Sequence, residues 1–118
     1  MSEPVTEMSD LHRELTRLLQ NWGLELMDEV PFPPFQVDIY VPQAHVAIEA
    51  DGPQHNRRAD ERRDEKLFEL YDLPVIHVTD EAIAEQASLR YALLAHIGIY
   101  MQTAEQRLTR CKAKLPWI

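Results

Sequence analysis

The chain has 118 residues and a net charge of −8, and no apolar run approaches the ~20 residues that a membrane-spanning helix needs. This length fits one domain, residues 1–118, with a core of ordinary size. The acidic, polar start is unlike a secretory or transit peptide, and a single cysteine, Cys111, excludes an internal disulfide. We therefore expect a cytoplasmic protein that makes no membrane contact.

The first half of the sequence predicts one helix followed by strands. Apolar side chains recur at steps of three and four over residues 4–22, which predicts a helix that ends at Gly23. A strand is expected over Leu24–Val30. Prolines then predict a loop over residues 31–34, because proline cannot donate to a strand ladder.

Two further strands are predicted at Gln36–Val41 and Val46–Ala50, joined by a tight turn. A helix is expected over Arg57–Tyr71, with a charged outer face of alternating sign that is typical of a solvated surface. A short strand follows at Val75–Val78, and Thr79 is a good cap for the helices of the last third. This order predicts an α/β fold with a mixed four-stranded sheet flanked by helices.

Acidic residues gather around the predicted hairpin. Alternation along the first strand places Asp38 opposite the apolar Val37 and Ile39. Pairing of the two strands then brings Asp38 beside Glu49 and Asp51. Carboxylates that converge in this way repel one another unless a proton or a hard cation lies between them. The sequence therefore predicts a Mg²⁺ or Mn²⁺ site with Asp38, Glu49 and Asp51 as metal ligands.

The spacing D-x(10)-E-x-D, with the segments IEADGPQH, RRDEKLFEL and VIHVTDEAI, resembles the PD-(D/E)XK nuclease superfamily, and within it the small Vsr-like endonuclease branch. The resemblance spans about residues 10–85. It implies a restriction-endonuclease-like αβββαβα core. It also implies a metal-dependent DNA endonuclease that nicks DNA or selects DNA structures in repair, recombination or phage DNA metabolism.

The resemblance also implies roles for single residues. Asp51 stands where the superfamily usually has lysine, so it would be a third metal ligand or would orient the attacking water. His55 would act as acid, base or phosphate contact, because the branch has a histidine shortly after its glycine. Ala50 would lend its backbone carbonyl to the metal, and Arg63 with Lys66 would bind the scissile phosphate.

The sequence allows two interpretations of Glu14. Related nucleases often bring a glutamate from the first helix to the metal, and Glu14 lies at the edge of that helix's apolar stripe. The alternative is a solvated glutamate that pairs with Arg17. Three other histidines (His12, His77 and His96) are expected to be surface or capping residues.

Other features leave alternatives open. The zinc-binding Cys/His sets of Vsr-type enzymes are absent, and His77 stands where relatives often have arginine. The segment DGPQH also resembles the RAP domain, which implies an RNA-binding module instead. A degenerate nuclease fold that serves as a protein-interaction subunit is a third reading. DNA is the expected partner, in a homodimer or a larger DNA-processing complex.

The distribution of charge bears on whether the partner is a nucleic acid or a protein. Residues 87–118 carry five Lys or Arg against Glu105 alone. A net charge of −8 disfavours binding to nucleic acid, although a metal held by carboxylates would offset part of it. A basic groove formed by the last helix would favour nucleic acid over protein as the partner.

Overall fold

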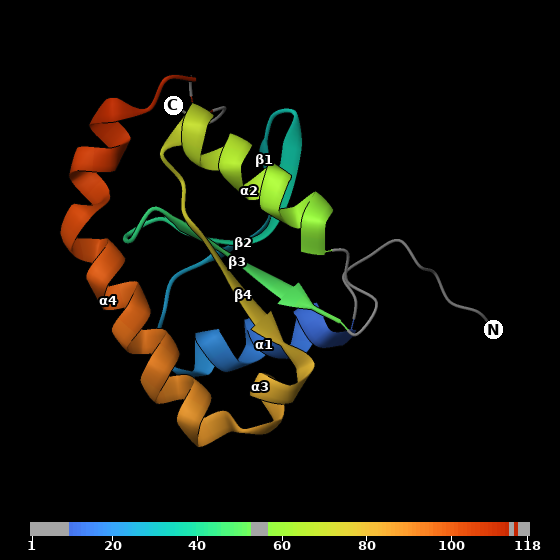
Figure 1. Ribbon diagram of the computed structural model, residues 1–118. Coiled ribbons are helices and arrows are strands. Elements are labelled where there is room, and N and C mark those ends of the chain that lie inside the picture. The colour runs from blue at the N-terminus through green and yellow to red at the C-terminus, as the bar shows by residue number, and fades with distance from the viewer. Residues whose placement is uncertain (1–9, 53–56, 114, 116–118) are drawn as a thin grey trace.

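The computed structural model describes residues 10–52, 57–113 and 115, and it contains one four-stranded sheet with helices on both faces (Figure 1). The strand order is β1-β2-β3-β4; the first three strands are antiparallel, and β4 is parallel to β3. The expected α/β architecture is confirmed. The elements are α1 (Asp10–Asn21), β1 (Met27–Phe32), β2 (Phe35–Val41), β3 (Val46–Asp51), α2 (Arg57–Tyr71), β4 (Val75–Thr79), α3 (Asp80–Ala84) and α4 (Gln86–Arg110).

A separate hydrophobic core lies on each face of the sheet. On one face, α1, α3 and the first half of α4 pack against alternate residues of β2, β3 and β4, among them Ile39, Ile48 and Ile76. On the other face, Leu67 and Tyr71 of α2 pack against Tyr40 and Ala47. The face that carries Asp38 is therefore covered by α2.

Strand β1 differs from its expected position. It begins three residues later than predicted and includes Pro31 and Phe32, which pair with Gln36 and Phe35. The prediction of a loop over residues 31–34 was thus wrong for its first two residues. Proline is tolerated here because β1 is an edge strand, where a missing N–H leaves no ladder position unpaired.

Thr79 caps α3 as predicted: its hydroxyl accepts a hydrogen bond from the backbone N–H of Ala82 at 3.1 Å. The first helix is confirmed from Asp10 onward, and residues 4–9 of the expected helix lie outside the described residues. No described helix is long and apolar enough to cross a membrane.

The structure does not place all arginines of the basic last third at the surface. Arg107 is only 4% exposed, and its guanidinium donates to the backbone carbonyls of Ala44 and His45 at 2.7 and 2.5 Å. Arg110 is exposed and pairs with Asp72 at 3.4 Å, while Lys114 lies outside the described residues. Arg107 therefore stabilises the fold and is not exposed for contact with nucleic acid.

Candidate metal-binding site

Asp38 and Glu49 lie side by side on the antiparallel strands β2 and β3. The backbone N–H of Asp38 donates to Glu49 Oε2 at 2.8 Å, and the N–H of Ala50 donates to Asp38 Oδ2 at 3.0 Å. Each carboxylate is thus held against the opposite strand. In the described part of the chain, no hydrogen bond or ion pair uses the second oxygen of either group. The adjacency that the hairpin predicted is confirmed.

Burial makes this pair electrostatically costly. It raises the pKa of Glu49, and the nearby charge of Asp38 raises that pKa further. The N–H of Asp38 and the guanidinium of Arg63 oppose the shift. Arg63 Nη2 lies 3.3 Å from Glu49 Oε2 and also donates to the carbonyl of Gln36 at 2.6 Å. The positive charge of Arg63 therefore stabilises the ionised form of Glu49.

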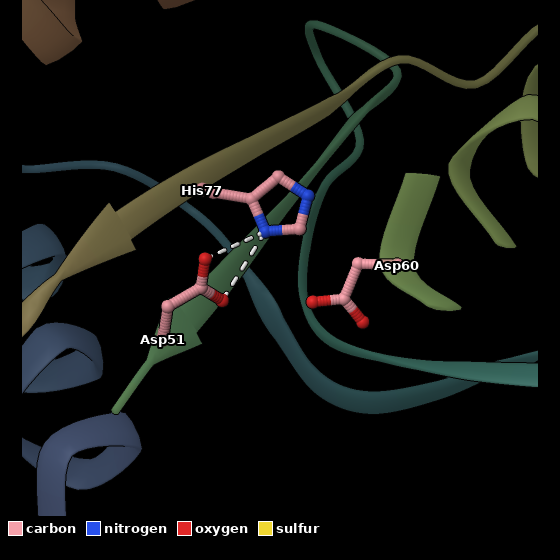
Figure 2. Close-up of side chains that lie close together, drawn as sticks. All are labelled: Asp51, Asp60 and His77. Atoms are coloured by element: carbon pink, nitrogen blue, oxygen red, sulfur yellow. Dashed lines mark hydrogen bonds and ion pairs between the residues drawn. The ribbon is translucent and has the colours of Figure 1, made fainter. Parts of the chain in front are cut away.

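Asp51 lies at the end of β3, two residues beyond Glu49, and it pairs with His77 of β4. The Nδ1 atom of His77 lies 2.9 Å from Asp51 Oδ2 and 3.2 Å from Oδ1 (Figure 2). The Nε2 atom of His77 lies 2.5 Å from Asp64 Oδ2 on α2. Asp64 and Asp51 raise the pKa of His77 to about 9 despite partial burial, so the imidazole is a cation at neutral pH.

A further carboxylate reaches this group from the start of α2. Figure 2 shows the Asp60 carboxylate pointing toward the imidazole of His77, across from Asp51. One ligand atom from each of Asp51, Asp60 and His77 can be chosen so that all three lie within 4.8 Å of one another. At that spacing, one metal ion can contact all three side chains.

Arg63 and Asp64 connect the two clusters. Arg63 Nη1 lies 3.7 Å from Asp64 Oδ1, so a continuous chain of ion pairs runs from Asp51 through His77, Asp64 and Arg63 to Glu49. The site then holds five carboxylates and two cationic side chains. An excess of negative charge in partly buried surroundings favours a divalent cation. The carboxylates are Asp38, Glu49, Asp51, Asp60 and Asp64.

The donor types suit a divalent metal in two places. Asp38 and Glu49 offer only oxygens, which suit Mg²⁺ or Mn²⁺. The group of Asp51, Asp60 and His77 adds an imidazole, which suits Mn²⁺ and later transition metals better than Mg²⁺. A metal at His77 would have to displace the proton that its raised pKa retains.

Two of the remaining predicted residues, Glu14 and Lys66, make their described contacts outside these clusters. Glu14 pairs with Arg17 at 3.6 Å on α1, and no described hydrogen bond or ion pair joins it to Asp38, Glu49 or Asp51. Lys66 is exposed and pairs with Glu69 at 3.3 Å. His55 lies outside the described residues. The roles assigned to these three residues stay predictions.

The sequence analysis missed Asp60, Asp64 and His77. Asp60 and Asp64 were assigned to a solvated helix face, yet both turn inward on the stripe that continues to Leu67 and Tyr71. The steps from Asp60 to Asp64, Leu67 and Tyr71 are four, three and four residues, a spacing that the sequence shows and that places all four on one helix face. His77 is no surface residue either, because it faces Glu49 across the parallel β3–β4 pair.

A comparison with solved structures finds the same fold in the catalytic domain of the homing endonuclease I-Bth0305I. The TM-score is 0.66 at 15% sequence identity, and the match covers 79% of this chain and 98% of that domain. The sequence itself matches no protein-family model and no curated protein. At this identity, the likeness concerns the fold.

Proposed function

We propose that the protein is a metal-dependent DNA endonuclease whose metal ligands are Asp38, Glu49 and Asp51. The observation that carries the proposal is the Asp38–Glu49 pair, in which two carboxylates are held by reciprocal hydrogen bonds across β2 and β3 and each keeps one oxygen uncommitted. The fold shared with a homing endonuclease catalytic domain supports DNA as the substrate.

The metal and the chain have separate tasks in this proposal. When bound, a divalent cation supplies charge neutralisation at the scissile phosphate and acidifies a coordinated water. Arg63, whose guanidinium lies between Glu49 and Asp64, would turn from Glu49 to bind the phosphate. His77 would position the Asp51 carboxylate.

Four roles extend the proposal to residues at its margin. Asp60 would complete the metal site from α2. His55 would carry a proton to or from the reacting oxygen, Glu14 would assist from α1, and Lys66 would add a second contact to phosphate. Mn²⁺ is the ion that suits both the oxygen-only pair and the group containing His77.

The test is a cleavage assay with the whole chain. Supercoiled plasmid and synthetic single-stranded, duplex and branched DNA are incubated with Mg²⁺, Mn²⁺ or EDTA, with Asp38→Asn alongside the wild type. We expect cutting that requires the metal and is lost in the variant, and the preferred substrate distinguishes nicking from structure-selective cleavage. Folded wild-type protein that cuts no substrate with either ion would refute the proposal.

A further inference from the structure

A second feature of the molecule lies on the outer face of α4, away from the metal site. The buried side of this helix is formed by residues such as Leu89, Leu93 and Ile97. Its outer side is also apolar: Tyr91 is 82% exposed, and Met101 is 47% exposed. In Figure 1, α4 forms one edge of the molecule, and no other described element covers this side.

The outer residues follow a heptad pattern. They recur at steps of four and three, the spacing of a seam between two packed helices. A shallow surface hollow of about 490 Å³ lies along the first half of this seam, between Ala87 and Ala95. The seam consists of Ala87, Tyr91, Leu94, Gly98, Met101 and Glu105.

Gly98 lies in the middle of this seam, and no close contact among the described residues requires a glycine there. A Cβ atom added at Gly98 would meet no atom within 4 Å. Glycine is nevertheless the least favourable residue after proline in a helix interior. A residue without a side chain at this point allows another helix to approach closely.

The seam is complementary to itself. If a second α4 runs antiparallel with its Leu94 over Gly98, symmetry places the first Leu94 over Gly98 of the second copy. The same register brings Met101 of one copy to the level of Tyr91 and the hollow of the other. A large side chain, Leu94, thus meets the small Gly98 on both sides of the two-fold axis.

Charge is complementary in the same register. Arg90 and Glu105 are exposed, and neither has an ion-pair partner in the described part of the chain. They lie about 22 Å apart along the helix and do not reach each other within one copy. In the antiparallel pair, Arg90 lies within about one helical turn of Glu105 in the second copy.

We propose that the α4 seam is the interface of a homodimer, in which two copies of this chain pack antiparallel with Leu94 of each over Gly98 of the other. The proposal is independent of the nuclease activity. Shape and charge both favour a second copy over an unrelated partner, because Leu94 finds Gly98, and Arg90 finds Glu105, on an identical helix.

The test is the molar mass of the whole chain in solution, measured by sedimentation equilibrium over a range of protein concentrations. Wild type should approach twice the monomer mass of 13.8 kDa. Leu94→Glu and Gly98→Leu should each raise the dissociation constant by at least about tenfold. We expect Gly98→Leu to keep the monomer fold, because a Cβ at this position meets no neighbour and leucine favours a helix.

Charge reversal supplies a specific control. Arg90→Glu and Glu105→Arg should each weaken the dimer, and the double variant should restore it, because the pair is exchanged in both copies. Phe68→Glu, on the half-exposed face of α2, should leave the mass unchanged. A wild type that stays at 13.8 kDa, or a Gly98→Leu variant that dimerises as tightly as wild type, would overturn the proposal.

Discussion

His77 and Asp51, on the parallel strands β4 and β3, form an ion pair with Nδ1 2.9 Å from Oδ2. The other ring nitrogen of His77 contacts Asp64 of α2. One imidazole thus joins the sheet to the helix that covers it. The pair fixes the direction of the Asp51 carboxylate, which the proposed metal site requires.

Replacement of His77 by glutamine should destabilise the fold. The variant removes the cation between Asp51 and Asp64 and leaves two partly buried carboxylates facing each other. We expect the free energy of unfolding to fall by roughly 1–3 kcal/mol in urea denaturation without metal. The double variant His77→Gln with Asp64→Asn should lose less than the sum of the two single variants. If the losses of the two single variants simply add in the double variant, His77 and Asp64 do not stabilise the fold through a shared contact.

We predict that the buried His45 makes the protein less stable in mild acid. Burial lowers the pKa of His45, whose ring lies between the Tyr40 hydroxyl at 2.7 Å and the Tyr71 carbonyl at 2.8 Å. The unfolded chain therefore binds this proton more readily than the folded chain does. The resulting stability is present above the unfolded pKa of 6.5 and is lost as pH falls below it.

The measurement is urea denaturation at about pH 7.5 and about pH 5, for wild type and for His45→Asn. Asparagine tolerates the positive φ of 45° at this position. Wild type should lose more stability between the two values, by at most ~1.4 kcal/mol for each pH unit. Equal losses in the two proteins would contradict the assignment to His45.

Arg107 should contribute far more to stability than its neighbour Arg110. Its buried guanidinium donates to four backbone carbonyls, and without it these acceptors lose their partner in the interior. Arg107→Leu should lower the free energy of unfolding by about 3 kcal/mol or more. Arg110→Gln, which removes an exposed contact at 3.4 Å, should cost less than about 1 kcal/mol. Similar losses in the two variants would exclude a structural role specific to Arg107.

The sequence predicts those parts of the fold that depend on local pattern. Alternation along β2 and β3, with a tight turn between them, is sufficient to place Asp38 beside Glu49. The start and end of α2 and the cap at Thr79 also follow from local signals. These features need no knowledge of distant contacts.

The missed residues depend on contacts between segments far apart in the chain. His77 joins the site only because β4 pairs with β3 in the register that sets it beside Glu49. The burial of Arg107 could not be predicted, because three of its four carbonyl partners lie more than 30 residues away. Composition describes how many charges a segment holds, whereas burial decides which of them meet solvent.

The central claim is that a divalent cation held at Asp38 and Glu49 is required for cleavage of DNA. The most direct test is the single-turnover cleavage rate in saturating Mn²⁺ for Glu49→Gln, with Glu81→Gln, at an exposed position of α3, as the matched control. We predict that Glu49→Gln remains folded and cuts at least ~100-fold more slowly, while the control matches wild type. A folded Glu49→Gln variant that cuts at the wild-type rate would contradict the claim.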